Sequence, residues 1–178
     1  MLLAKNDGSR TKVRNPVFLA GEILARNKKA FYEYEIIARY TAGVVLEGYE
    51  VKAVREGKVN FDGSFVQINK HIPVVLNLHI GRYMYQSQKD EGADTRRTRM
   101  LLLSKKEIQK IERELSQKGY TAVPLALATQ AQAPKGALIS SKSMLKLELA
   151  VVRGRKMYEK KDLEKRKQQL KDMGMSRL

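Results

Sequence analysis

The side chains in this sequence with the clearest chemical potential are lysines and arginines that stand in short runs. Arg96, Arg97 and Arg99 lie within four consecutive positions, and Lys52 and Arg55 are three residues apart in GYEVKAVR. A guanidinium group binds a phosphate through paired hydrogen bonds, so these spacings suit contact with a phosphate backbone. The alternative is a solvated surface, on which the neighbouring glutamates neutralise Lys52 and Arg55.

The densest run of cations follows the segment that begins at Met144. There Leu145, Leu147, Leu149 and Val151 alternate with other residues, as in a strand with one buried face. The chain beyond residue 153 has little apolar surface with which to offset the entropy of ordering. We therefore predict a flexible basic extension over residues 1–26, a packed domain over 27–156 and a basic tail over 157–178.

The net charge of +16 over 178 residues is concentrated at the two ends, since residues 1–29 carry +5 and residues 153–178 carry +6. Two basic arms on a milder body are typical of a protein with a polyanionic partner, although such arms can also serve solubility alone. The absence of cysteine fits a reducing compartment. No apolar run approaches the ~20 residues that span a membrane, and the N-terminus lacks the apolar core of a signal peptide. We expect a cytoplasmic protein without a membrane partner.

The sequence contains none of the common catalytic motifs. A Walker sequence, a dinucleotide glycine fingerprint, an HExxH zinc motif and a Gly-x-Ser-x-Gly elbow are all absent. Because the histidines number two and cysteine is missing, we predict no metal site, no catalytic residue and no cofactor. An enzyme acting on nucleic acid and a ribosomal structural protein, or a general basic RNA-binding protein, remain as alternatives.

The pattern of apolar residues predicts a mainly β fold, a small antiparallel barrel of the oligonucleotide-binding (OB) type with short flanking helices. Residues 104–118 form the clearest helix, with a capping box from Ser104 and Glu107 and an end at Gly119. Residues 49–58 are ambiguous between strand and helix, and Gly57 as a C-terminal cap favours the helix. The expected strands cover residues 31–40, 44–46, 64–68, 73–80, 120–127 and the segment from 144. A break is expected at 41–43 and a turn at 69–70. Pro124 places the strand over 120–127 at an edge or at a bend. Long loops are expected over 81–99 and 128–142.

Six segments of the chain, in order, resemble the SsrA-binding protein family, also called small protein B. They are NKKAFYEYEI (27–36), AGVVLEGYEVKAVREGKVN (42–60), NLHIGRY (77–83), RTRMLLLSKKEI (97–108), KGYTAVPLAL (118–127) and LKLELAVVRGRKMYEKK (145–161). The resemblance implies an OB-type barrel that binds the tRNA-like domain of transfer-messenger RNA (tmRNA, or SsrA) and carries it to stalled ribosomes for trans-translation. It implies a monomeric RNA-binding module for ribosome rescue and not a catalyst.

Carried over by matching motif, the resemblance implies two sets of site residues. The expected RNA-binding set comprises Lys28, Lys29, Glu50, Lys52, Arg55, Lys58, Arg97, Arg99, Lys118, Tyr120, Thr121, Lys146 and Arg153. The expected ribosome-binding tail comprises Gly154, Arg155, Lys156, Tyr158, Lys160, Lys161, Lys165 and Arg166. In the family this tail lies at the decoding centre and in the empty mRNA channel. We expect it to be disordered in the free protein and helical on the ribosome, where neutralised cations and pairs such as Asp162 with Arg166 favour a helix.

Four features of the chain depart from the family pattern. Tyr32-Glu33 stands where the family has His-Asp, and Glu159-Lys160-Lys161 stands where it has Asp-Lys-Arg. The loop over 128–142 is longer than usual, and residues 1–26 precede the first matching segment. The charge type survives each change in the tail, so these departures concern details of contact.

Overall fold

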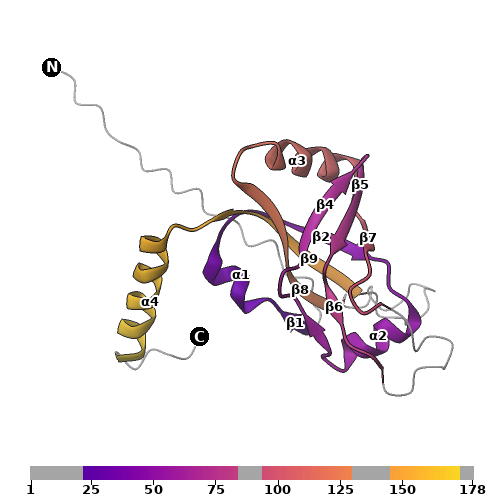
Figure 1. Ribbon diagram of the computed structural model, residues 1–178, viewed down its shortest axis with the longest axis horizontal. Helices are drawn as coiled ribbons and strands as arrows, with labels where there is room; N and C mark the ends of the chain where they lie inside the picture. Colours follow the sequence, from indigo (N-terminus) through magenta and orange to yellow (C-terminus); the bar gives the residue numbers. More distant parts are fainter. Residues whose placement is uncertain (1–21, 84–93, 130–144, 173–178) are drawn as a thin grey trace, which may run out of the picture.

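The computed structural model describes residues 22–83, 94–129 and 145–172. Figure 1 shows a ring of strands with helices around it and one helix that extends away from it. The elements in chain order are β1 Ile23–Arg26, α1 Lys28–Glu33, β2 Tyr34–Val44, α2 Gly48–Arg55, β3 Val59–Asn60, β4 Phe65–Asn69, β5 Ile72–Leu76, β6 His79–Ile80, β7 Arg99–Leu102, α3 Lys105–Leu115, β8 Tyr120–Thr129, β9 Leu145–Gly154 and α4 Met157–Asp172.

Antiparallel pairing closes the main sheet on itself. Its strand order is β1-β8-β4-β5-β7-β2-β9, and an additional pairing joins β8 to β9, so six of the strands form a ring and β1 lies outside it on β8. The short strands β3 and β6 make a separate two-stranded sheet. The predicted mainly β fold with flanking helices is confirmed.

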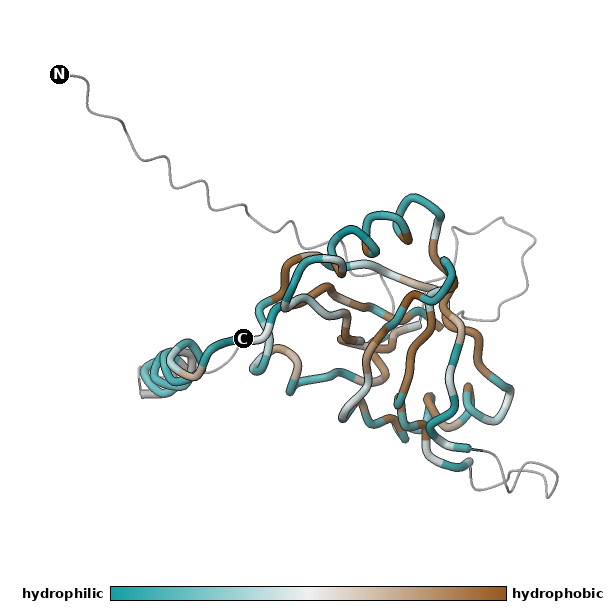
Figure 2. The backbone as a smooth tube through the Cα atoms, turned by 45° about the horizontal axis from the view of Figure 1, so that its top comes forward, coloured by the Kyte–Doolittle hydropathy of each residue, from teal (hydrophilic) through white to brown (hydrophobic). Residues whose placement is uncertain are grey.

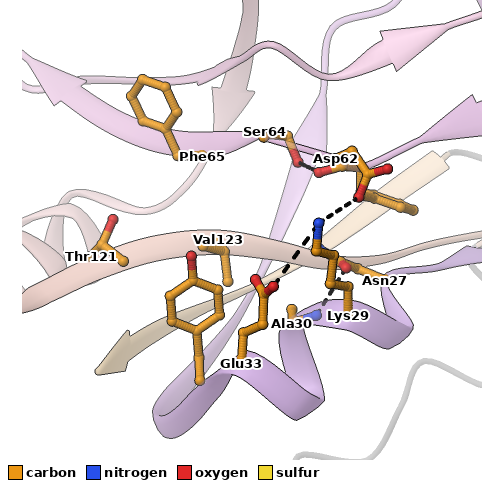
Figure 3. A pocket seen from close by; sticks show the side chains of 12 residues that line it. Asn27, Lys29, Ala30, Glu33, Asp62, Ser64, Phe65, Thr121 and Val123 are labelled. Atoms are coloured by element: carbon orange, nitrogen blue, oxygen red, sulfur yellow. Dashed lines mark hydrogen bonds and ion pairs between the residues drawn. The ribbon is translucent and has the colours of Figure 1, made fainter. Parts of the chain in front are cut away.

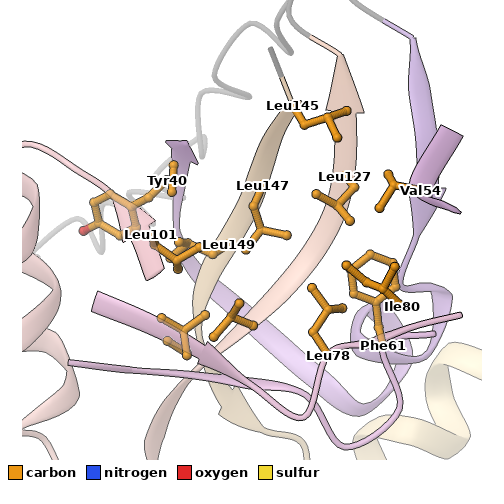
Figure 4. Close-up of a cluster of buried hydrophobic side chains, with 14 of the residues drawn as sticks. Tyr40, Val54, Phe61, Leu78, Ile80, Leu101, Leu127, Leu145, Leu147 and Leu149 are labelled. Carbon is orange, nitrogen blue, oxygen red and sulfur yellow. The ribbon is translucent and has the colours of Figure 1, made fainter. Parts of the chain in front are cut away.

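The interior of the ring is filled by alternate residues of the long strands. Figure 4 shows Leu127 of β8 and Leu147 and Leu149 of β9 pointing into this core, and all three are fully buried. The intervening residues of the same strands point outward, where Ala30 of α1 covers Val123, Leu125, Ala150 and Val152 in a second cluster. Both faces of β8 and β9 are therefore buried, which explains why these strands read as nearly continuous apolar runs.

The helices differ in how much apolar surface they bury. Helix α2 contributes Ala53 and Val54 to the main core, and α3 contributes Ile111. Figure 2 shows that α4 is hydrophilic along almost all of its length. The capping box of Ser104 and Glu107 forms as predicted, because the Ser104 hydroxyl accepts from the Glu107 N–H and the Glu107 carboxylate accepts from the Ser104 N–H.

The start of the first long strand was predicted too early. Residues 31–33 lie in α1 because Asn27 caps that helix: its Oδ1 accepts from the Ala30 N–H at 3.0 Å, and its Nδ2 donates to the Pro124 carbonyl at 3.0 Å. The break predicted at 41–43 is wrong as well, because β2 continues to Val44. Gly43 sits inside the strand and makes room for Leu102, whose Cβ would lie 3.2 Å from a Cβ at position 43.

Other boundaries differ through local backbone geometry. The strand predicted over 73–80 is divided into β5 and β6 at Asn77, which has a left-handed φ of 56°. The β4–β5 turn is centred on Lys70 and His71, with φ of 48° and 64°, one residue later than predicted. The bend expected at Pro124 is confirmed by a register shift between Pro124 and Ala126, but β8 is not an edge strand. The ambiguous segment 49–58 is helical as far as Arg55, the end of α2, and Gly57 follows the C-cap with a φ of 74°.

Two expectations are not tested by this structure. Most of the loop predicted over 128–142 falls outside the described residues. Residues 157–172 form α4. That the tail is disordered in the free protein and becomes helical on the ribosome stays a prediction.

Candidate nucleic-acid interface

The first group of predicted site residues lies around the short helix α1. Lys28 and Lys29 are exposed on the helix that Asn27 caps. Figure 3 shows Lys29 beside a pocket, with its ammonium group directed toward Asp62 and Glu33. The pocket has a volume of about 400 Å³, and the ammonium lies 3.6 Å from Asp62 and 4.0 Å from Glu33. Thr121 of β8 lines the same pocket. We call Lys28, Lys29 and Thr121 the α1 surface.

The ends of β8 and β9 bring further predicted residues next to one another. Tyr120 lies opposite Arg153 in the β8–β9 pairing. Tyr120 is half-buried against the core, Lys118 is exposed in the preceding turn, and Arg153 donates to Glu35 at 2.8 Å. That hydrogen bond raises the pKa of Arg153.

The second group lies on α2. Lys52 and Arg55 are both exposed, and the Lys52 ammonium lies 5.0 Å from the centre of the Tyr83 ring, a cation–π contact. Of the two neighbouring glutamates, Glu50 points into the protein and Glu56 pairs with Lys58 at 2.8 Å. We call Lys52, Arg55 and Tyr83 the α2 surface.

Beneath α2 lies a buried charged network that joins residues far apart in the chain. Glu50 is 2% exposed and Arg99 is 0% exposed. Glu50 Oε1 accepts from Arg97 Nε and from Arg99 Nε, each at 2.9 Å, and Glu50 Oε2 accepts from Arg97 Nη2 at 2.6 Å. Arg99 also donates to the backbone carbonyls of Leu78, Arg97 and Thr95.

The network places two of the predicted RNA-binding residues, Glu50 and Arg99, inside the protein, and their part in RNA binding stays a prediction. Their charged groups face each other inside the protein. Burial alone would raise the pKa of Glu50, but hydrogen bonds from Arg97, the Glu47 N–H and Arg99 outweigh it and lower that pKa. Glu50 therefore stays ionised and ties α2 to the start of β7. Arg97, 29% exposed, is the member of the network that reaches the surface.

Two predicted residues take other positions. Lys58 pairs with Glu56 and donates to the Arg82 carbonyl at 3.3 Å, just beyond α2. Lys146 lies opposite Gly43 and Ala128, at the other end of β9 from Arg153. The structure therefore does not bring Lys146 together with the other predicted cations.

The tail begins with fixed contacts to the domain. The Arg155 N–H donates to the Glu33 carbonyl at 3.0 Å, and Arg155 Nε donates to the Tyr34 carbonyl at 2.9 Å. Farther along α4, the Tyr32 hydroxyl donates to Glu164 at 2.6 Å, and the Lys160 ammonium lies 5.9 Å from the Tyr32 ring centre. The hydrogen bond to Glu164 raises the pKa of Tyr32. The remaining predicted tail residues are exposed: Gly154, Lys156, Tyr158, Lys161, Lys165 and Arg166.

Sequence reasoning missed three residues that organise these surfaces. Asn27 carried a usable signal, because Asn immediately before a helix is a preferred cap. Tyr83 carried none, since its partner Lys52 is remote in sequence. Tyr32 was noted only as a departure from a family pattern, and its contact with α4 depends on tertiary structure.

Within the part of the chain that the structure describes, no three His, Asp or Glu side chains gather where they could hold a metal ion. None of the described helices is both long and apolar enough to cross a membrane.

Comparisons with known proteins agree on one family. The family model described as SmpB protein matches residues 24–177. The SsrA-binding protein of Nitratiruptor sp. is 41% identical over 146 residues, which cover 82% of this chain and 90% of that protein. The SsrA-binding protein of Bacteroides thetaiotaomicron is 38% identical over 148 residues, covering 83% and 91%. A chain in a solved structure described as "tmRNA-SmpB: a journey to the center of the bacterial ribosome" is similar with a TM-score of 0.58 and 36% identity, covering 75% of this chain and 85% of that one.

Proposed function

The chain belongs to the SmpB family, and from this premise we propose that it binds the tRNA-like domain of tmRNA and delivers it to stalled ribosomes. The observation that carries the proposal is the family match over residues 24–177, which includes every cation of the α1 and α2 surfaces. The RNA is a polyanion, and the protein carries a net charge of +16.

We propose that the RNA lies against the α1 and α2 surfaces. Arg97, the member of the buried network that reaches the protein surface, would contact the RNA there as well. Phosphate contacts supply most of the affinity in such an interface, while aromatic rings stack on unpaired bases. Glu50 and Arg99 act indirectly, because they hold α2 in the orientation that presents Lys52 and Arg55.

We propose that α4 occupies the decoding centre and the empty mRNA channel. Its sixteen residues span about 24 Å as a helix. Lys161, Lys165 and Arg166 are exposed along it, and Tyr158 is 60% exposed at its start. A base stacked on Tyr158 would contribute roughly 1–3 kcal/mol to binding.

The proposed activity is binding and delivery, without catalysis of a covalent step. Because ribosomes are cytoplasmic, we propose the cytoplasm as its location and a monomer as its working form. The alternative of a general RNA-binding or ribosomal structural protein predicts stoichiometric co-purification with every ribosomal subunit, whereas a rescue factor should be substoichiometric and enriched on stalled complexes.

A gel shift of the purified protein with the tRNA-like domain of tmRNA tests this proposal. The binding preference is measured at physiological salt, with an ordinary tRNA as competitor. Preferential binding of the tRNA-like domain is the expected result. Equal, salt-sensitive binding of both RNAs would reduce the proposal to general RNA binding.

A further inference from the structure

On the outer side of the ring, apolar side chains lie next to one another on β5, β7 and the end of β2. On β4 the apolar Phe65 shares this side with the polar Gln67 and Asn69, which lie opposite Val74 and Ile72. The register places Phe65 opposite Leu76, Val74 opposite Met100, and Gly43 opposite Leu102. Val45 follows in the same ladder, because its N–H donates to the Met100 carbonyl at 3.0 Å. We call the following residues the apolar sheet face: Val45, Phe65, Ile72, Val74, Leu76, Met100 and Leu102.

The alternation of the strands explains why these residues share one side. Val66, Val75 and Leu101, which lie between them in sequence, are buried in the core at 3%, 0% and 3% exposure. The apolar sheet face points the other way, and Met100 and Leu102 are 51% and 60% exposed.

On another part of the ring, a helix covers the outward apolar residues of the strands. On β8 and β9 the outward residues Val123 and Val152 are buried beneath Ala30 of α1. No helix or strand in the described part of the chain covers the apolar sheet face in that way. A contiguous exposed apolar patch, as opposed to scattered apolar residues, marks an interaction site.

The chemistry of the face argues for a protein partner. RNA recognition needs cations and stacking aromatic rings, whereas the face contains no charged residue and Phe65 as its one aromatic. The strands are paired around the ring, so a partner would pack on the face without adding a strand to an edge.

The surrounding charges favour an acidic partner over a second copy of this chain. Lys70 precedes Ile72 in the hairpin turn, and Lys105 and Lys106 follow Leu102 at the start of α3; all three are exposed. A second copy would bring the same lysines and another net charge of +16 against them. Glu47, at the opposite end of the face, is already paired with Arg97 at 3.8 Å.

We propose that the apolar sheet face binds an acidic protein of the translation machinery. The choice of machinery rests on the proposed function, whereas the face itself follows from strand register and exposure. Figure 1 shows β5 and β7 on the side of the ring away from α1 and α4. The two ends of the face border the proposed RNA surfaces, because Phe65 lines the pocket beside α1 and Val45 lies just before α2.

The first test replaces Leu102 with a photo-crosslinking amino acid in the full-length chain. The control carries the crosslinker at Ile37, which is 37% exposed and lies outside the face. Both proteins are irradiated with tmRNA and stalled ribosomes in a translation system assembled from individually purified components, and each crosslinked component is identified by mass spectrometry. The expected result is a crosslink from position 102 to one acidic protein, about tenfold above the Ile37 control.

The second test uses Met100→Glu and Met100→Lys, measured as inhibition of that crosslink. Against an acidic partner, the glutamate should weaken binding by about tenfold or more and the lysine by distinctly less. Because position 100 is half exposed, both variants should keep the parental thermal midpoint and the parental affinity for the tRNA-like domain. This affinity, measured in parallel, separates a failure here from a failure of the proposed function.

The proposal would be overturned if Met100→Lys inhibited the crosslink more than Met100→Glu, if position 102 crosslinked to RNA, or if its crosslink did not exceed that of the Ile37 control. It would also be overturned if sedimentation showed a dimer that Met100→Glu dissociates. A membrane partner would be indicated instead if the protein co-sedimented with vesicles of phosphatidylcholine and phosphatidylglycerol and Met100→Glu abolished this binding.

Discussion

Replacing Glu50 with glutamine should destabilise the whole domain, because it leaves a buried guanidinium without its counter-charge. Arg99 is 0% exposed and receives charge compensation from Glu50 at 2.8 Å. Removing one partner of a buried ion pair costs about 3–5 kcal/mol of unfolding free energy. For a chain of this size that loss corresponds to a fall of roughly 6–20 °C in the thermal midpoint.

The matched control is Glu56→Gln, the same chemical change six residues along the chain, at the C-cap of α2. Glu56 pairs with Lys58 at 2.8 Å, but the two side chains are 38% and 42% exposed. An exposed pair of this kind contributes about 0–1 kcal/mol, so the control should stay close to the parent protein. Urea unfolding followed by far-ultraviolet circular dichroism gives both free energies.

The pH dependence gives the prediction a second readout. The pKa of Glu50 is lowered from its ordinary value of 4.5, so the folded state holds this proton more weakly than the unfolded state. The stabilisation is therefore fully present above the ordinary pKa and is lost as the pH falls through the lowered one. The difference in stability between the parent and Glu50→Gln should be constant near neutral pH and should shrink in acid below pH 4.5.

A second substitution identifies the cause. In Glu50→Gln with Arg99→Met, the uncompensated charge is removed, but three backbone carbonyls lose the donor that Arg99 supplied. The combined loss of stability should therefore be smaller than the sum of the two single losses. The reasoning would be refuted if Glu50→Gln lost no more stability than Glu56→Gln, or if the losses of Glu50→Gln and Arg99→Met simply added in the double variant.

Three further predictions concern the tail, the RNA surfaces and a helix cap. Deleting residues 157–178 should leave folding and affinity for the tRNA-like domain nearly unchanged while abolishing peptide tagging on stalled ribosomes; a truncated protein that still tags would contradict this. The logarithm of the affinity for the tRNA-like domain should fall steeply and linearly with the logarithm of the salt concentration, and Lys52→Ala should reduce the slope by about 0.7–0.9 if it removes one phosphate contact; an unchanged slope would remove Lys52 from the interface. Ser104→Ala removes the N-cap of α3 and should cost about 0.5–2 kcal/mol in urea unfolding, whereas Ser116→Ala, near the other end of the helix, tests whether the loss of any helix-end hydroxyl has the same effect.

Local patterns in the sequence were sufficient to predict several parts of the fold. The alternation in β9, the capping box of Ser104 and Glu107, and Gly57 after α2 all act within a few residues, so their effect can be worked out from neighbouring positions. The order of the matching segments likewise predicted the family and the closed antiparallel architecture, because both are properties of the chain as written.

Only the tertiary structure decided which charged residues face the solvent. Glu50 and Lys52 are two positions apart on α2, yet one is buried and the other is exposed. Glu50 is buried because folding brings Arg97 and Arg99, 47 and 49 residues away, to the same point. The free energy of burying a charge depends on whether a counter-charge is present there, and the pairing of β7 with its neighbours provides it. A sequence pattern cannot report that pairing, because it is a property of contacts between distant segments.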